Sequence, residues 1–132
     1  MIVTAGCLAA VTMILICHMN KYELFVMIFY ALEHEWDQVR GDELGDFLSD
    51  MNPFMFDDVG SADPAVYSHF CSVIDEPVTK KNSYSLAWKY VDSVGKSFVK
   101  DAFLRISKSR WDECLNVYLS SEHKGMLKRG LV

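Results

Sequence analysis

The sequence has few of the residues that mark several protein classes. Three prolines and seven glycines are too few for a collagenous or low-complexity chain. The four cysteines are scattered, which excludes a small disulfide-rich scaffold. Basic residues number 13 against 18 acidic ones, and the net charge of -5 argues against a general nucleic-acid binder. With 132 residues, 51% of them hydrophobic, the chain is expected to form one domain with a single core.

The beginning of the chain lacks charge. Residues 2–17 form an uncharged apolar run, and the first basic residue is Lys21. The missing basic region argues against a secretory signal, and a helix over this run would span about 24 Å, less than the ~30 Å core of a bilayer. Three interpretations of residues 1–18 stay open: a misassigned start upstream of Met19, a membrane anchor or poor signal, or a buried helix or strand.

Hydrophobic periodicity indicates helices in the rest of the chain. Residues 20–39 predict one long helix, capped by Asn20 with Glu23 and apolar on almost all sides, as is typical of a central helix. Gly41 is expected to end it, and Asp42 to cap a second helix that runs to about Asp50. Further helices are predicted over 63–76, 82–94, 97–106 and from 109 onward. Asp63 and Ser109 are expected to cap two of them, and Gly95 to take the left-handed conformation after the helix over 82–94. We therefore predict an all-α domain of five to seven helices over 19–125, followed by a basic tail over 126–132.

Charge divides the chain into two unequal parts. Residues 19–63 hold eleven acidic and two basic residues, a net charge of −9, whereas residues 64–132 hold seven acidic and eleven basic residues, a net charge of +4. Asp42, Asp46 and Asp50 stand at i, i+4 and i+8, so they share one helical face. Like charges at this spacing repel by roughly a few tenths of a kcal/mol per pair, and a facing cationic partner reverses the effect.

This asymmetry predicts a non-catalytic module that binds a basic protein partner through an acidic surface, with aromatic side chains at the centre of the interface. The residues expected to bind the partner are Glu33, Trp36, Asp37, Asp42, Glu43, Asp46, Asp50, Phe54, Phe56, Asp57 and Asp58. The alternative is a solvated acidic face that the basic second part of the chain balances within the same fold. No cofactor, metal or nucleic acid is expected, and the oligomeric state is left open. We expect a cytoplasmic protein, or a membrane-anchored helical domain if residues 2–17 are an anchor.

Motifs for catalysis or metal binding are lacking. The group around His34 has neither the His-Glu-x-x-His nor the Glu-x-x-His spacing of metal sites on helices. Asp57, Asp58 and Asp63 lack the alternating ligands and closing glutamate of a helix–loop–helix calcium site. We interpret Cys71 and Cys114 as buried thiols, although an enzyme around Cys71 or the carboxylates stays a third hypothesis.

One stretch resembles known proteins. The segment NPFMFDDVGSADPAVYSHF over 52–70, ahead of SSEHKG over 120–125, is similar to small acidic, largely uncharacterised bacterial proteins, some of them suspected partners of toxins. The resemblance covers residues 20–125 and carries no functional residue with it. It implies an immunity protein or antitoxin, whose partner would be a toxin.

Overall fold

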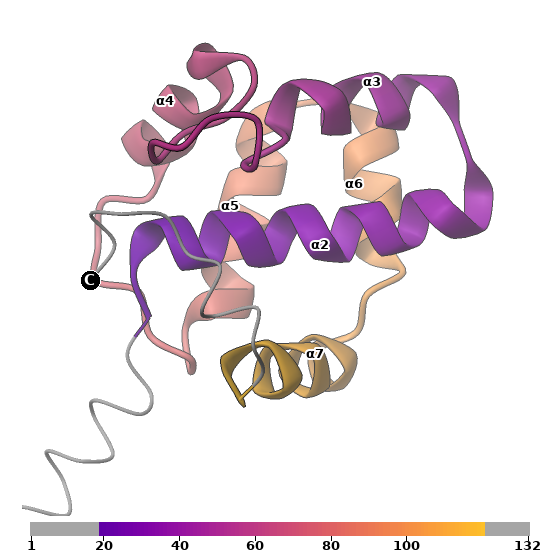
Figure 1. Cartoon of the computed structure of the whole chain (residues 1–132). Helices are drawn as coiled ribbons and strands as arrows, with labels where there is room; N and C mark the ends of the chain where they lie inside the picture. Colours follow the sequence, from indigo (N-terminus) through magenta and orange to yellow (C-terminus); the bar gives the residue numbers. More distant parts are fainter. Residues whose placement is uncertain (1–18, 121–132) are drawn as a thin grey trace, which may run out of the picture.

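The computed structural model describes residues 19–120, which form six α-helices and no β-strand (Figure 1). The helices are α2 (Lys21–Val39), α3 (Asp42–Met51), α4 (Pro64–Val73), α5 (Ser83–Val94), α6 (Ser97–Leu104) and α7 (Lys108–Ser120). The predicted all-α class is confirmed. The predictions made for residues 1–18 and 126–132 lie outside the described residues.

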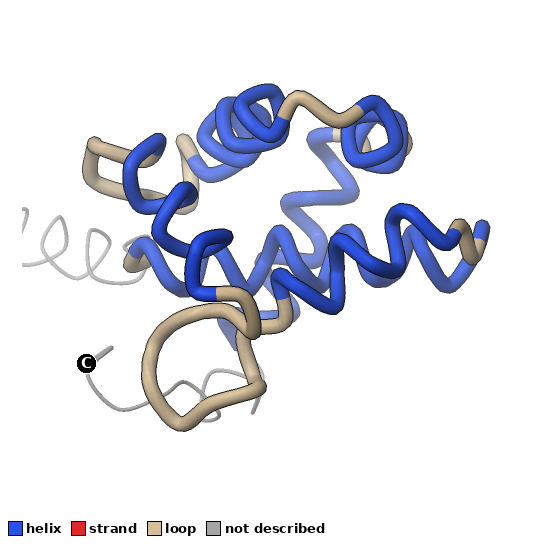
Figure 2. The backbone as a smooth tube through the Cα atoms, turned by 90° about the horizontal axis from the view of Figure 1, so that it is seen from above, coloured by secondary structure: helices blue, strands red, loops and turns tan. Residues whose placement is uncertain are grey.

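Helix α2 is the centre of the fold, as its sequence predicts. It contacts each of the other five described helices. In Figure 1, α3 runs back along α2 in the opposite direction, α5 and α6 lie behind α2, and α7 lies on the side away from α3. Figure 2 shows the longest described connection, the loop over 52–63 between α3 and α4, as a wide arc beside the helices. This arrangement leaves α3 and the 52–63 loop at the surface.

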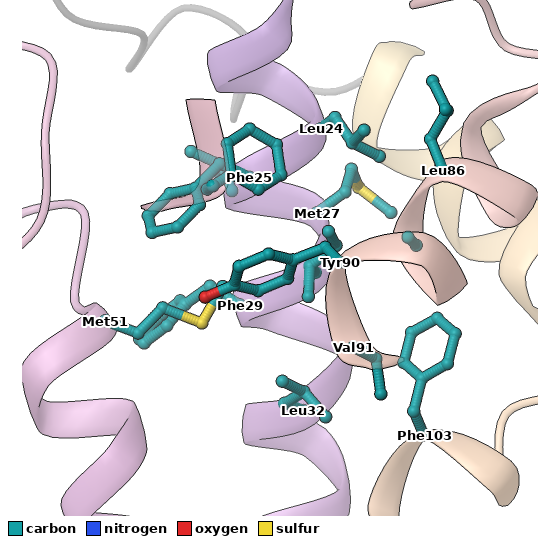
Figure 3. Close-up of a cluster of buried hydrophobic side chains, with 14 of the residues drawn as sticks. Leu24, Phe25, Met27, Phe29, Leu32, Met51, Leu86, Tyr90, Val91 and Phe103 are labelled. Carbon is teal, nitrogen blue, oxygen red and sulfur yellow. The ribbon is translucent and has the colours of Figure 1, made fainter. Parts of the chain in front are cut away.

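A single core explains why α2 is apolar on most sides. Every residue of α2 from Tyr22 to Phe29 is buried. Figure 3 shows the side chains that meet in the core, from α2 (Leu24, Phe25, Met27, Phe29, Leu32), α3 (Met51), α5 (Leu86, Tyr90, Val91) and α6 (Phe103). Because helices cover α2 on several faces, its sequence shows no broad polar face.

Three predicted helix ends are confirmed by their hydrogen bonds or backbone angles. The Asn20 side chain accepts a bond from the Glu23 N–H at 2.8 Å, and the Glu23 carboxylate accepts one from the Asn20 N–H at 3.1 Å. Asp63 caps α4 by accepting a bond from the Ala65 N–H at 3.0 Å. Gly95 follows α5 with a φ of 70°, a left-handed conformation that glycine adopts at little cost.

Other helix ends differ from the sequence prediction. Arg40, and not Gly41, takes the left-handed conformation after α2, with a φ of 57°. Gly41 is extended and precedes α3, so Asp42 is the first helical residue and does not cap the helix. Helix α4 ends earlier than predicted, at Val73. Helix α7 begins at Lys108, because the Ser107 hydroxyl accepts a bond from the Arg110 N–H at 3.2 Å in place of the predicted cap at 109.

Candidate protein-binding surface

The eight carboxylates predicted to bind a partner are all exposed: Glu33, Asp37, Asp42, Glu43, Asp46, Asp50, Asp57 and Asp58. Within residues 19–120, none of them forms an ion pair with a lysine, arginine or histidine. We call these eight side chains the acidic surface. No described residue therefore neutralises these charges, and they face solvent.

One carboxylate of the acidic first part is neutralised internally. Glu35 is buried on α2, and its two oxygens pair with Arg105 at 3.1 Å and with Arg110 at 3.0 Å. The other described ion pairs join Lys89 to Asp75, Lys100 to Asp92 and Lys108 to Asp112, all within the basic second part. The basic second part of the chain thus neutralises Glu35 but none of the carboxylates of the acidic surface.

The start of α4 places a fourth aspartate beside the end of the row of three on α3. Asp42, Asp46 and Asp50 lie on the exposed face of α3. The Asp63 N–H donates to the Asp50 carbonyl at 2.9 Å, so the exposed Asp63 side chain lies near the last of the three. Asp63 was not among the residues predicted to bind a partner, because its position beside Asp50 depends on how the 52–63 loop folds.

The other end of α3 borders a hollow of about 530 Å³. Asp42, Glu43 and Asp101 of α6 line it together with Arg105, which pairs with Glu35, and apolar residues complete the lining. Asp101 was missed by the sequence analysis, since it comes from the basic second part of the chain and joins the acidic residues only through the packing of α6 against α3.

The 52–63 loop presents the apolar part of the surface. Phe54, Met55 and Phe56 are 39%, 57% and 57% exposed. The loop is held against α2, because the Tyr22 hydroxyl donates to the Pro53 carbonyl at 2.6 Å. The Phe54 ring also lies 5.7 Å from that of Tyr30, so this aromatic residue is fixed while part of it faces solvent. Phe54 and Phe56 are thus exposed, and Asp57 and Asp58 follow them in the chain.

Trp36 occupies a different position from these aromatic residues. Its ring is half-buried in the turn between α2 and α3, where the indole N–H donates to the Gly41 carbonyl at 3.0 Å. A Cβ atom on Gly45 would lie 2.9 Å from the indole nitrogen, so α3 packs directly on the ring. The Arg40 guanidinium covers the ring at 4.9 Å from its centre. In this position Trp36 holds the turn together and presents little of its ring to a partner.

Glu33 and Asp37 form a close pair on α2, one helical turn apart. Partial burial raises the pKa of Glu33 above its ordinary value, and the charge of Asp37 raises it further. Burial raises the pKa of Tyr30, and the charge of Glu33 raises it further. The charge of Glu33 is thus less stable here than in water, and a nearby cation would stabilise it.

The residues considered for metal binding and catalysis are not brought together. Among residues 19–120, no three histidine, cysteine, aspartate or glutamate side chains form a group suited to hold a metal ion. Cys71 is half-buried, whereas Cys114 is exposed on α7. The prediction of a buried thiol is therefore wrong for Cys114, because this residue lies at the open edge of the contact between α7 and α2.

Helix length and comparison with known proteins add two findings. No helix in the described part of the chain is both long and apolar enough to cross a bilayer. The chain matches no family model, no curated protein and no solved structure in the comparisons made. The resemblance to small acidic bacterial proteins therefore stays a prediction.

Proposed function

We propose that the protein is a non-catalytic binding module that engages a basic protein partner through the acidic surface. The observation that supports this proposal is that the eight carboxylates are exposed and form no ion pair with a described residue. Complementary charges on a partner speed its association and favour one orientation of binding, and this effect weakens as salt increases.

Apolar contacts would supply the centre of the interface. Phe54, Met55 and Phe56 are exposed together on a loop that hydrogen bonding fixes to α2. Protein interfaces are typically built in this way, with a buried apolar centre and a charged rim that remains partly solvated. An immunity protein or antitoxin that binds a basic toxin is the class of protein we propose, on the basis of the charge pattern and the resemblance.

A charge-reversal experiment tests the acidic surface directly. The triple variant Asp42→Lys, Asp46→Lys, Asp50→Lys should bind a lysine- and arginine-rich probe peptide with an association rate about tenfold lower at low salt. Its association rate should also depend less on salt concentration. Stopped-flow measurements at two ionic strengths give both quantities.

A matched control separates the position of the charges from the net charge. The triple variant Asp75→Lys, Asp92→Lys, Asp112→Lys changes the net charge by the same amount, but its aspartates already pair with lysines in the second part of the chain. Association should be faster for this control than for the α3 variant. Equal slowing of both variants would show that only net charge matters and would contradict the proposal.

We also propose that the protein is cytoplasmic. Fractionation of cells that express the tagged full-length chain tests it. Recovery of the chain in the membrane fraction, and its release after deletion of residues 2–17, would instead favour the membrane-anchored alternative.

A further inference from the structure

Residues 54–58 form an exposed tip between two anchored parts of the 52–63 loop. All five of these residues are exposed. Pro53, just before them, is buried, and its carbonyl accepts a bond from the Tyr22 hydroxyl at 2.6 Å. Val59, just after them, packs against the core. We call residues 54–58 the loop tip, which lies on the wide arc seen in Figure 2.

Contacts within the loop restrict the tip further. The Phe54 N–H donates to the Asn52 side chain at 2.9 Å, a bond that closes a tight turn. The Asn52 carbonyl accepts a bond from the Ala62 N–H at 2.9 Å, so the two ends of the loop are joined. The Phe54 ring lies 6.1 Å from that of Phe29 and 5.7 Å from that of Tyr30. A loop held in this way loses little conformational freedom when it binds, and this favours affinity.

The tip combines apolar and acidic side chains. Met55 and Phe56 are each 57% exposed. Asp57 and Asp58 follow them and form no ion pair with a described residue. The whole 52–63 loop contains three aspartates and no lysine or arginine. A surface complementary to the tip is therefore apolar where it meets the first two side chains and positively charged beside the carboxylates.

This charge limits what can cover the apolar side chains. A second copy that bound tip to tip would bring the Asp57 and Asp58 carboxylates of both copies together, and like charges repel. A nucleic acid or an anionic lipid surface would repel the tip for the same reason. A projecting apolar segment also fits a hollow better than a flat surface, because a hollow contacts it on several sides. The complementary site is thus a concave apolar pocket in a protein, with basic groups at its edge.

We propose that the loop tip is a preformed binding loop that inserts Met55 and Phe56 into an apolar pocket of the basic partner. Lysine or arginine side chains at the edge of this pocket contact Asp57 and Asp58. Phe54 packs against α2 and supports the two inserted side chains. This inference rests on the proposed function and adds the shape of the partner's site and the side chains that enter it.

The first test uses β-cyclodextrin, a ring-shaped oligosaccharide with an apolar cavity, as the probe. A derivative with amino groups on one rim adds positive charge beside the cavity. At low salt the full-length protein should bind this derivative about tenfold more tightly than unmodified β-cyclodextrin, and salt should reduce the difference. Isothermal titration calorimetry measures both affinities. Equal affinities at low salt would overturn the proposal.

Substitutions identify the side chain that enters the cavity. Phe56→Ala should weaken binding of the amino derivative by about tenfold. Leu104→Ala is the matched control, because Leu104 is 61% exposed but lies on α6, away from the 52–63 loop, and this variant should bind as the unsubstituted protein does. Circular dichroism verifies that both variants fold. Equal weakening in the two variants would show that the probe binds any exposed apolar side chain and would contradict the proposal.

A second pair of variants tests the carboxylates of the tip. Asp57→Asn with Asp58→Asn should remove most of the preference for the amino derivative. Asp42→Asn with Asp46→Asn changes the net charge equally at exposed positions of α3 and should retain the preference. Equal loss in both double variants would attribute the preference to net charge and exclude a specific role of the tip carboxylates.

Proteolysis tests whether the tip is preformed. Chymotrypsin cleaves after phenylalanine in segments that open locally. Tyr22→Phe removes the hydroxyl that donates to the Pro53 carbonyl and should speed cleavage at Phe56 by about two- to tenfold. Tyr84→Phe removes a hydroxyl that donates to the Ile106 carbonyl at the same distance of 2.6 Å, and should leave this cleavage unchanged. Equal acceleration would mean that a general loss of stability exposes the loop and would contradict a fixed tip.

Two competing occupants give different results. A dimer of the full-length protein in sedimentation velocity that Phe56→Ala abolishes would assign the tip to a second copy. Binding to phosphatidylcholine vesicles that the same variant abolishes would assign it to lipid. Either result would overturn this inference, whereas the charge reversal on α3 would still decide the proposed function. We expect neither dimer nor vesicle binding to depend on Phe56.

Discussion

Glu35 and Arg105 lie 70 residues apart in the sequence and form an ion pair, in which the Arg105 Nε donates to a Glu35 oxygen at 3.1 Å. The Arg110 Nη1 donates to the second oxygen at 3.0 Å. The two sides of this cluster differ in burial, because the Glu35 side chain is 4% exposed and the arginines are 44% and 39% exposed. Water can therefore solvate the arginines if they lose the carboxylate, but it cannot solvate the carboxylate as well.

This difference in burial predicts unequal costs of substitution. The double variant Arg105→Met, Arg110→Met leaves a buried carboxylate unpaired and should lower the free energy of unfolding by about 3–5 kcal/mol. Glu35→Gln leaves two hydrated arginines and should cost about 1–2 kcal/mol. Urea denaturation measures both. Lys108→Met removes an exposed i,i+4 pair and is the control, with an expected cost of about 0.3–0.5 kcal/mol. Equal losses for the first two variants would contradict the argument.

The two ends of α3 predict opposite effects of removing an aspartate. Asp42 is the first residue of the helix, where the partial positive charge of the helix dipole stabilises a carboxylate, so Asp42→Asn should destabilise the fold by about 0.3–1 kcal/mol. Asp50 lies at the negative end, near Asp46 and Asp63, and Asp50→Asn should stabilise the fold by roughly 0.3 kcal/mol. Thermal unfolding at low salt measures the difference, which high salt should remove. Effects of the same sign would show that the dipole does not dominate.

Buried tyrosines predict loss of stability at alkaline pH. Burial raises the pKa of Tyr22 to about 12, and burial also raises the pKa of Tyr90 above its ordinary value of 10. Between pH ~10 and 12 these side chains ionise in the unfolded chain and stay protonated in the folded one. Each should therefore remove about 1.4 kcal/mol of stability per pH unit in this window.

The Tyr90→Phe variant provides the test. The variant has one ionisable group fewer in its core. Between neutral and alkaline pH it should therefore lose less free energy of unfolding than the unsubstituted protein, and its alkaline unfolding midpoint should lie at higher pH. Tyrosinate absorbance and circular dichroism during an alkaline titration report ionisation and unfolding separately. Ionisation of the core tyrosines well before any loss of helix would contradict the predicted coupling.

A buried hydrogen bond between α5 and α7 gives a further prediction. The Trp111 indole N–H donates to the Ser83 hydroxyl at 2.9 Å, and both side chains are fully buried. Ser83→Ala leaves the indole N–H without this acceptor and should cost about 1–3 kcal/mol. Ser85→Ala, at an exposed position of the same helix, should change stability by less than about 0.5 kcal/mol. Equal costs in urea denaturation would exclude a role for the buried bond.

Local signals in the sequence predicted much of the fold. The caps at Asn20 and Asp63 and the left-handed Gly95 depend on residues close together in the chain, so their residue types were sufficient. The end of α2 and the start of α7 were harder to predict. At the end of α2, Arg40 takes a left-handed conformation that most side chains disfavour, and its guanidinium lies over the Trp36 ring. The Trp36 ring is itself held by Gly45 of α3, which packs against it, and no local pattern predicts that packing.

The candidate site was predicted in part for the same reason. Exposure of the α3 aspartates follows from helical spacing, and exposure of Phe54 and Phe56 from their place in a loop. Sequence alone does not distinguish Glu35, which is buried and paired, from its exposed neighbour Glu33. Charge patterns predict the sign of a surface, but only the packed structure shows which charged side chains form ion pairs within the fold.

The hydrogen bond from Tyr22 to Pro53 has a consequence for fragments of this chain. It fixes one end of the exposed 52–63 loop, and the bond from Asp63 to Asp50 fixes the other. A single proteolytic cut beside Phe56 therefore leaves both new termini attached to the folded body. The nicked protein should persist as a complementing pair, and only denaturant should separate the strongly negative first fragment from the second.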